Sequence, residues 1–320
     1  MATSKKAFIT GCSGFVGNYL AAHLASLHWE VSGMDRWPAC DIAGLSYHEG
    51  DILDTAALAE MLATVKPDRI FHLAGISFLP DADLSPRHAL DINIMGAASA
   101  LDAARQSCPS ARILLVGSSK EYGDMPSSET IAETTPCRPT NFYGVSKYMA
   151  ECIGMQYARQ YGLDVRFTRS FNHTGPGQSP RFVCSDWTKQ AAEIDLGRRE
   201  ARIQVGDVTP AIDITDVRDV VSAYHLILEK CAAGEAYNVC SGSAAALRDV
   251  LSLIQKKAKK PITIEQDDAR LRLHTTSTRT VGDHNKLTAA TGWMPKIPLE
   301  KTLDDLYRYW IAKLSSPPQA

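Results

Sequence analysis

Short apolar segments alternate along the first half of the chain with longer segments that mix apolar and polar residues. The short segments predict buried strands at residues 6–10, 30–34, 69–73, 111–116 and 164–169. The longer segments predict helices at residues 19–24, 55–65, 88–107 and 143–161. Strands that alternate with helices predict an α/β fold built on a doubly wound parallel sheet.

A glycine-rich loop joins the first predicted strand to the first predicted helix. Gly11, Gly14 and Gly17 follow Thr10 with GxxGxxG spacing rather than GxGxxG. Glycines in such a turn let the backbone approach a pyrophosphate, and the N-terminus of the next helix supplies N–H donors. An ordinary glycine-rich turn is the alternative. The order of strand, loop and helix favours a dinucleotide site in a Rossmann-type sheet.

An acidic residue, Asp35, ends the second predicted strand. A carboxylate about 20 residues past the glycine loop can bind both ribose hydroxyls of NAD, and it would repel the 2′-phosphate of NADP. Arg36 could instead hold such a phosphate. The sequence therefore favours NAD(H), with NADP(H) as the alternative. A plain turn residue at the end of a strand is the other interpretation of Asp35.

Tyr143 and Lys147 stand four residues apart, and therefore on one face of the predicted helix. A phenol titrates near pH ~10, and a nearby ammonium lowers that pKa because it favours the phenolate. The pair alone is weak evidence for a catalytic site, since this spacing also arises by chance on helix surfaces. Together with the glycine-rich loop, it indicates a nicotinamide-dependent enzyme that acts on an alcohol or a ketone.

The alternation loosens after about residue 173, where glycine and proline become frequent and shorter elements return near residues 237–239. We expect residues 1–173 to form the NAD(P)-binding domain, with further strands and helices from about 211–240. Residues 174–320 are expected to form mainly a smaller substrate-binding lobe. Ligands of such sheets bind at the carboxyl ends of the strands. The residues at those ends are Gly11, Asp35, Ala74, Ser118 and Asn172.

Composition and charge narrow the class of protein. A net charge of −2 over 320 residues gives no basic surface for nucleic acid. No apolar stretch of 18 residues predicts a membrane span, and the first strand starts too early to leave room for a signal peptide. Eight cysteines without a CxxC pair and nine histidines without ligand spacing predict no metal site. We expect a cytoplasmic enzyme with reduced thiols.

Over nearly its whole length the chain resembles the extended short-chain dehydrogenase/reductases that act on nucleotide sugars. The resemblance rests on residues 10–17, Asp51-Ile52, residues 72–75, Asn93, residues 117–123 and Tyr143-x-x-x-Lys147. Four later stretches, at residues 171–178, 213–219, 237–242 and 291–293, are similar to the GDP-4-keto-6-deoxy-D-mannose reductases, which make GDP-D-rhamnose. The GDP-mannose 4,6-dehydratases are closely related to them.

The resemblance implies roles for individual residues. Ser118, Tyr143 and Lys147 would be catalytic, with Tyr143 as the acid that protonates the C4 oxygen of a 4-keto sugar. Cofactor binding is implied for Gly11, Ser13, Gly14, Phe15, Val16, Gly17, Asp35, Arg36, Asp51, Ile52, Leu73, Ala74, Gly75 and Asn93, together with Tyr143 and Lys147. Substrate binding is implied for Ser119, Asn172, Arg181, Arg218 and Arg270, whereas His173 could either touch the cofactor or pack within its loop.

The residues after Ser118 favour a reductase over a dehydratase. In the resembled dehydratases, a glutamate one or two positions later removes the C5 proton of the sugar. This chain has Ser119 and Lys120 there, and a protonated ammonium cannot readily replace a carboxylate base. Glu121 comes one residue late, and we expect it to point elsewhere.

One departure from the pattern of the resembled family leaves the identity of the substrate open. Ala211 and Ile212 stand where the resembled reductases usually carry the arginine that pairs with the nucleotide diphosphate. Arg270 and Arg272 match the other basic pair of the family, although a solvated charged loop is the plain interpretation. The alternatives are a different nucleotide or sugar, a 4-epimerase, a 4,6-dehydratase, or a non-catalytic dinucleotide-binding sensor.

The two predicted helices at residues 88–107 and 143–161 carry apolar residues on more than one face. These are Leu90, Ile92, Ile94, Met95, Ala98 and Leu101 in the first, and Met149, Ile153, Met155 and Tyr157 in the second. In the resembled family the two helices form a four-helix bundle across a two-fold axis. We therefore expect a symmetric homodimer with one complete active site in each subunit. The alternative is that these residues fill the core of a monomer.

Overall fold

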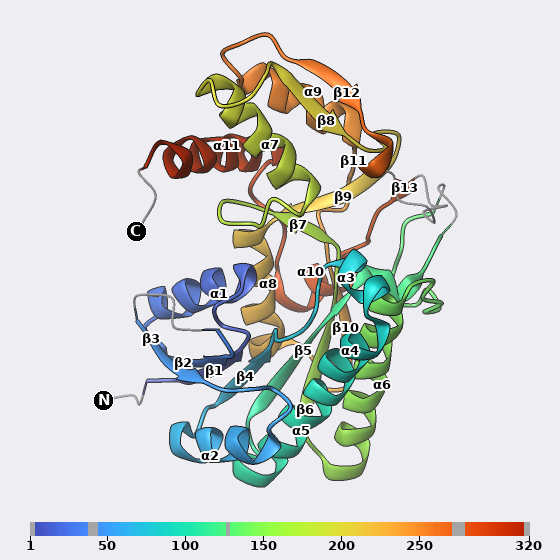
Figure 1. The fold of residues 1–320 in the computed structure, drawn as a ribbon. Helices are drawn as coiled ribbons and strands as arrows, with labels where there is room; N and C mark the ends of the chain where they lie inside the picture. Colours follow the sequence, from blue (N-terminus) through green and yellow to red (C-terminus); the bar gives the residue numbers. More distant parts are fainter. Residues whose placement is uncertain (1–3, 38–43, 126–128, 271–278, 317–320) are drawn as a thin grey trace.

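The computed structural model describes residues 4–37, 44–125, 129–270 and 279–316 (Figure 1). Its main feature is a seven-stranded sheet in the order β10-β6-β5-β4-β1-β2-β3, in which every neighbouring pair is parallel. The strands are β1 (Lys6–Thr10), β2 (Glu30–Asp35), β3 (Leu45–Glu49), β4 (Arg69–His72), β5 (Arg112–Ser118), β6 (Asp164–Ser170) and β10 (Ala236–Val239). The predicted doubly wound α/β fold is confirmed.

Helices cover both faces of this sheet and build a separate core on each. On one face, α1 (Phe15–Ser26) packs with α8 (Val217–Lys230), and their cluster includes Leu20 and Tyr224. On the other face lie α2 (Thr55–Val65), α5 (Gly96–Ser107) and α6 (Phe142–Tyr161) (Figure 1). This second arrangement encloses Leu58 and Leu101. Burial on both faces explains the apolar runs in the inner strands β1, β4 and β5.

The helix predicted at residues 88–107 is interrupted rather than regular. It consists of α4 (Pro86–Leu90), a π-helical turn η1 (Asp91–Met95) and α5, and a short helix α3 (Leu79–Leu84) precedes it. The π turn buries Asn93, whose Oδ1 accepts the Ile76 N–H at 2.7 Å and whose Nδ2 donates to Ser146 Oγ at 2.8 Å. Such turns are frequent at functional sites. Here the turn fixes Asn93 between the loop after β4 and helix α6.

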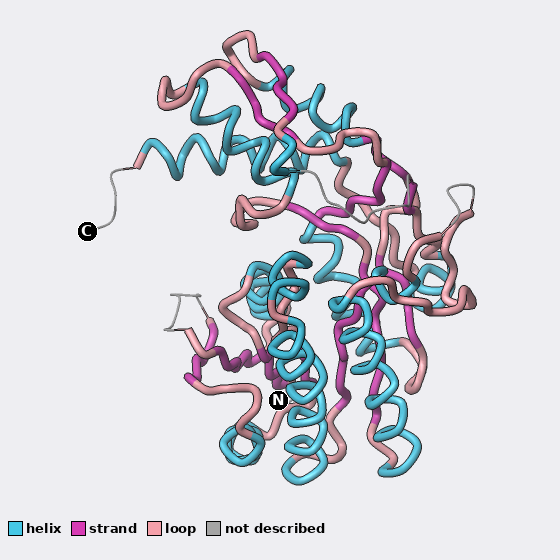
Figure 2. Tube along the Cα trace, turned by 45° about the vertical axis from the view of Figure 1, so that its right-hand side comes forward, coloured by secondary structure: helices cyan, strands magenta, loops and turns pink. Residues whose placement is uncertain are grey.

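A smaller lobe lies over the carboxyl ends of the large sheet. Its strands are β7 (Asn172–Thr174), β8 (Arg202–Val205), β9 (Ala211–Asp216), β11 (Ala244–Ala246), β12 (Thr263–Gln266) and β13 (Arg279–Thr280). Its main helices, α7 (Val183–Asp195), α9 (Leu247–Lys257) and α11 (Leu299–Ser315), share a third core, and it also contains the short turn η3 (Asp268–Arg270). Two other short elements pack against the large sheet and its helices, η2 (Ser119–Tyr122) and α10 (Asn285–Thr291). Since β6 ends at Ser170 and β7 begins at Asn172, the lobe starts where β6, the strand next to the edge strand β10, ends. Figure 2 shows the two parts from a second side.

Within the described residues, none of the helices combines the length and the apolar character that crossing a membrane requires.

Candidate active site

The glycine-rich loop between β1 and α1 is shaped by contacts that exclude side chains. Gly11 has φ +73°, and a Cβ there would lie 2.8 Å from the backbone nitrogen of Ala74. A Cβ on Gly17 would lie 2.4 Å from the carbonyl oxygen of Gly11. Gly14, in contrast, has open space beyond a 3.2 Å approach to that oxygen, and it forms the N-cap of α1 without a side chain of its own. The first N–H groups of α1 therefore face an open position that suits an anion.

The carboxylate of Asp35, at the end of β2, stands beside this loop. The Ser13 N–H donates to Asp35 Oδ2 at 3.2 Å, and the Arg36 N–H donates to Asp35 Oδ1 at 2.8 Å. Ser13 Oγ is buried and has no hydrogen-bond partner among the described residues. An orphaned hydroxyl, an anchored carboxylate and an open helix N-terminus fit the ribose and pyrophosphate of a dinucleotide. The Arg36 guanidinium lies 5.3 Å from the centroid of the Trp37 ring.

The remaining predicted cofactor residues lie on the loops after β3 and β4. The Asp51 carboxylate accepts the Leu53 N–H at 2.9 Å, and Ile52 is buried against Gly96. Leu73 and Ala74 are half-buried beside the glycine loop, where the Ala74 N–H donates to Thr10 Oγ1 at 3.3 Å.

Gly75 lies at the meeting point of three elements. A Cβ there would lie 2.8 Å from Asn93 Oδ1 and 3.5 Å from Lys147 Nζ. The structure therefore brings together the loop after β4, the π turn and helix α6. On the far side of the glycine loop, the ring of Phe15 stacks on that of His173, with centroids 6.3 Å apart. Val16, one residue later, is half-buried in the first turn of α1.

The three predicted catalytic residues come from the end of β5 and the start of α6. Ser118 is the last residue of β5, and Tyr143 and Lys147 lie one turn apart on α6. The first turn of α6 is packed tightly on the η2 turn, because a Cβ on Gly144 would lie 2.4 Å from the carbonyl oxygen of Lys120. This packing brings Tyr143 into hydrogen-bonding contact with Ser118.

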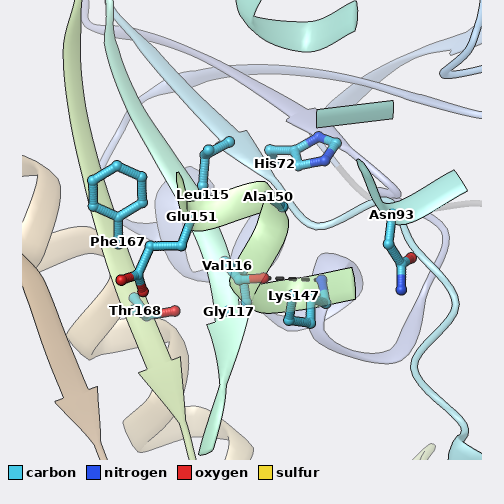
Figure 3. Close-up of a pocket in the computed structure, with 10 residues that line it drawn as sticks. All are labelled: His72, Asn93, Leu115, Val116, Gly117, Lys147, Ala150, Glu151, Phe167 and Thr168. Atoms are coloured by element: carbon cyan, nitrogen blue, oxygen red, sulfur yellow. Dashed lines mark hydrogen bonds between the residues drawn. The ribbon is translucent and has the colours of Figure 1, made fainter. Parts of the chain in front are cut away.

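Lys147 extends beneath the sheet end, where its Nζ donates to the carbonyl oxygen of Val116 at 2.9 Å (Figure 3). A cavity of about 10 Å³ lies beside it, lined in part by His72, Asn93, Glu151 and Thr168. That is roughly the space that one water molecule needs. The ammonium is thus held among polar groups of β4, β5, β6 and α6.

Burial dominates the proton affinities of Tyr143 and Lys147. It raises the pKa of Tyr143 to about 12, against the hydrogen bond with Ser118, and it lowers the pKa of Lys147 to about 8. The sequence predicted that Lys147 would lower the pKa of the phenol. In the structure the Lys147 ammonium donates to the carbonyl oxygen of Val116, and desolvation by burial is the largest influence on the pKa of Tyr143. His72, which hydrogen-bonds to Thr10 Oγ1 at 2.9 Å, has its pKa lowered to about 3, mainly by burial.

Glu121 is turned inward from the catalytic serine. It is fully buried, and its Oε1 accepts the backbone N–H of Ser118 at 2.6 Å. Glu121 therefore lies behind Ser118, as expected for a residue that is one position late for the dehydratase base. Ser119, also buried, follows Ser118 in the η2 turn.

The predicted substrate arginines occupy three separate places, each beside carboxylates. Arg181 forms a two-pronged ion pair with Asp81 and lies 4.0 Å from the centroid of the Phe78 ring. Arg218 pairs with Asp216 at 2.6 Å and with Asp305 at 2.9 Å.

Arg270, in η3, pairs with Asp186 at 2.6 Å. The matching Arg272 lies outside the described residues. Asn172 donates from Nδ2 to the carbonyl oxygen of Asp213 at 3.2 Å. Ala211 and Ile212 begin β9 and pair with β11 and β13, so they contribute to the small sheet.

Sequence reasoning missed two buried acidic positions near the site. One is the buried group of Glu121, Glu151 and Arg169 behind Ser118. The other is Asp213, whose carboxylate accepts four hydrogen bonds from residues 241, 242 and 282. Ionisable residues within apolar strands and helices were the available signal, because a charge is buried only with partners.

Comparisons with known proteins agree with this geometry. The family described as GDP-mannose 4,6 dehydratase matches residues 8–306. The chain is 34% identical over 312 residues to GDP-6-deoxy-D-mannose reductase of Pseudomonas aeruginosa, covering 97% of this chain and 99% of that protein. The chain belongs to the extended short-chain dehydrogenase/reductase family of NAD(P)-dependent nucleotide-sugar enzymes.

Other members of this family are similar over most of their length. GDP-mannose 4,6 dehydratase 1 of Arabidopsis thaliana is 26% identical over 321 residues, which cover 93% of this chain and 87% of that protein. Among solved structures, RMD from Pseudomonas aeruginosa complexed with NADPH is 33% identical with a TM-score of 0.86, covering 97% of this chain and all of that one. The family membership thus extends to both the large sheet and the smaller lobe.

The described residues contain no group of three or more side chains arranged to hold a metal ion.

Proposed function

We propose that this protein reduces the C4 ketone of a GDP-4-keto-6-deoxyhexose with NAD(P)H. The observation that carries the proposal is the contact between Ser118 and Tyr143, with Lys147 one turn away and Glu121 directed away from the serine hydroxyl. This arrangement retains an acid for a carbonyl oxygen and offers no carboxylate in the position of a C5 base. The similarity to a GDP-6-deoxy-D-mannose reductase supports the same substrate class.

The reaction adds a hydride and a proton to a carbonyl group. The bound nicotinamide supplies the hydride that reaches C4. Tyr143 donates its proton to the C4 oxygen, and Ser118 donates a hydrogen bond that stabilises the negative charge developing there. Lys147 stabilises the resulting phenolate, which regains a proton from solvent. The loop glycines, Ser13 and Asp35 would hold the pyrophosphate and ribose. Asn172 and the arginines of the smaller lobe would face the nucleotide sugar.

A substrate panel tests this function. We expect oxidation of NADH or NADPH in step with consumption of GDP-4-keto-6-deoxymannose, and little with the UDP and dTDP counterparts. A 4-epimerase or 4,6-dehydratase would instead carry a tightly held NAD that does not exchange. Binding of the cofactor without turnover of any sugar would favour the non-catalytic sensor and contradict the proposal.

Asp35 leads us to propose NADH as the better cofactor. Its carboxylate would bind both ribose hydroxyls, and hydrogen bonds to a charged group contribute about 1.5–3 kcal/mol, or roughly a tenfold to hundredfold preference in kcat/KM. Comparing kcat/KM for NADH and NADPH decides which cofactor the protein prefers. We expect Asp35→Asn to reduce the preference for NADH. The similar reductase structure holds NADPH. A preference for NADPH here would mean that Arg36 governs the choice.

We also propose a symmetric homodimer through α5 and α6. Ile92, Ile94 and Leu101 are buried within the chain's own core, so they do not support it. Met95, the last residue of the π turn before α5, and Met149 of α6, however, remain 53% and 45% exposed. Exposed methionines on neighbouring helices favour an apolar interface.

Light scattering at micromolar concentration should give twice the mass of the chain, and Met149→Lys should give a monomer. Leu27→Lys is the matched control, because Leu27 is 42% exposed at the end of α1, on the opposite face of the sheet. A monomeric wild-type protein would contradict the dimer.

A further inference from the structure

Two carboxyl groups and one guanidinium are buried together behind the catalytic serine. Glu151 of α6 and Arg169 of β6 form a two-pronged ion pair, with Arg169 Nη2 to Glu151 Oε1 at 2.6 Å and Nε to Oε2 at 3.0 Å. The other terminal nitrogen of Arg169 donates to Tyr122 Oη and to the carbonyl oxygen of Glu133, both at 3.2 Å. The charge of the guanidinium is therefore matched by Glu151.

The third member, Glu121, has its two oxygens in different surroundings. Oε1 accepts the Ser118 N–H at 2.6 Å. Oε2 is buried, and no donor among the described residues forms a hydrogen bond to it, since the nearest Arg169 nitrogen lies 3.7 Å away. A buried carboxylate with one unsatisfied oxygen is costly, whereas a protonated Oε2 becomes a donor that can reach Glu151. Burial and the charge of Glu151 both raise the pKa of Glu121.

The chain makes room for this carboxyl group. A Cβ on Gly117 would lie 2.3 Å from Glu121 Oε1 and 2.4 Å from the carbonyl oxygen of Thr168. Ser118 and Glu121 also form a reciprocal capping box around the η2 turn, in which Ser118 Oγ accepts the Lys120 N–H at 3.2 Å. The carboxyl group thus fixes the backbone of Ser118 at the end of β5, and with it the direction of the serine hydroxyl.

We propose that Glu121 is a positioning residue for Ser118 that is held as an uncharged carboxylic acid, with its proton on Oε2 and directed at Glu151. The contribution to turnover rests on the proposed reductase function, whereas the protonation state does not.

An uncharged Glu121 matters because other ionisable groups face it from three sides. A negative charge there would raise the proton affinity of Tyr143 and of Lys147, making the phenol a weaker acid. The charge of Glu121 itself depends on Arg169 and Glu151. The groups that face Glu121 are Tyr143, Lys147, Glu151 and Cys152 of α6, Arg169 of β6, and Cys137 of the loop that precedes α6.

Infrared spectroscopy of the whole protein at neutral pH tests the protonation state without a substrate. The wild type should show the carbonyl stretch of a protonated carboxylic acid, and this band should be lost in Glu121→Gln. It should also be lost in Glu151→Gln, because Arg169 then has only Glu121 to pair with and Glu121 ionises. Glu133→Gln is the matched control and should retain the band, since Glu133 accepts the Asn238 N–H and does not contact Ser118. Identical wild-type and Glu121→Gln spectra would overturn the proposal.

Kinetics in the 4-keto sugar assay test the positioning role. Glu121→Gln keeps an uncharged acceptor for the Ser118 N–H, so it should retain kcat and the pH profile of the wild type. Glu121→Leu removes the acceptor and should lower kcat by about a hundredfold with little change in KM, as expected for a displaced reacting group. In Glu151→Gln, the alkaline loss of activity should move to higher pH, because Tyr143 then loses its proton at higher pH.

A shifted profile in Glu121→Gln would contradict the uncharged state, and full activity of a folded Glu121→Leu would contradict positioning. If the wild type reduces no sugar of the panel, the proposed function fails while the infrared result still decides the charge. In that case the amide proton resonance of Ser118 replaces kcat. It should keep its position in Glu121→Gln and move upfield in the leucine variant, and no movement would contradict positioning.

Discussion

Replacing Tyr143 with phenylalanine is expected to lower kcat for the reduction by about a thousandfold, the usual contribution of a positioned proton donor. The phenyl ring keeps the shape of a side chain that is buried between α4 and α6, but it has no proton to give to the C4 oxygen. The folded state and the cofactor site should be preserved, because Tyr143 contributes only its hydroxyl to the contact with Ser118.

The measurement combines steady-state kinetics with titration of NADH binding by fluorescence. Binding should change little while turnover is lost. Tyr148→Phe is the matched control, because Tyr148 lies on the same helix and is only half-buried, outside the catalytic group. Near-normal turnover of the Tyr143 variant would show that another group protonates the substrate.

Replacing Asp213 with alanine is expected to destabilise the protein by about 3–5 kcal/mol, because its buried carboxylate accepts four hydrogen bonds and each contributes about 0.5–1.5 kcal/mol. The carboxylate accepts the Ser241 N–H and Oγ–H, both at 2.7 Å, the Gly242 N–H at 2.9 Å and the Gly282 N–H at 3.2 Å. It thereby joins β9 of the small sheet to the segments that follow β10 and β13.

Urea unfolding measures this effect. Asp207→Ala is the matched control, because among the described residues the Asp207 carboxylate accepts hydrogen bonds only from Thr209, two residues away on the surface. We expect the control to change the free energy of unfolding by less than about 1 kcal/mol. Equal effects of the two substitutions would mean that the junction at Asp213 does not stabilise the fold.

The sequence predicted the large sheet well because its signals are local. Buried parallel strands appear as short apolar runs, and the turn at Gly11–Gly17 combines a positive φ with close backbone contacts that only glycine permits. The strand β3 was missed, since its residues Leu45–Glu49 lie at the edge of the sheet and are half-buried or exposed. The π turn was missed as well, because Asn93 holds it through partners at residues 76 and 146.

The partners of the predicted site residues were harder to predict than the spacing of those residues. Tyr143 and Lys147 follow from their spacing on one helix. The sequence does not show which carboxylates pair with the arginines, because Asp81 lies 100 residues from Arg181 and Asp186 lies 84 residues before Arg270. An arginine that looks available to a diphosphate in the sequence can thus be paired in the fold. Glu121 was predicted to point elsewhere than a C5 base, and its Oε1 accepts the Ser118 N–H. Arg169 and Glu151, which contact Glu121 in the fold, gave no local signal.

The late position of α8 and β10 in the chain determines when the protein can fold during synthesis. Strand β10 completes the sheet beside β6, and α8 covers the core around Leu20 and Tyr224, although both follow strands of the smaller lobe. A nascent chain that has emerged only to residue 173 has six strands of the sheet, but one edge and one apolar face remain exposed. Unpaired strand edges and uncovered cores promote aggregation. The ribosome must therefore deliver about 240 residues before the nucleotide-binding half is protected.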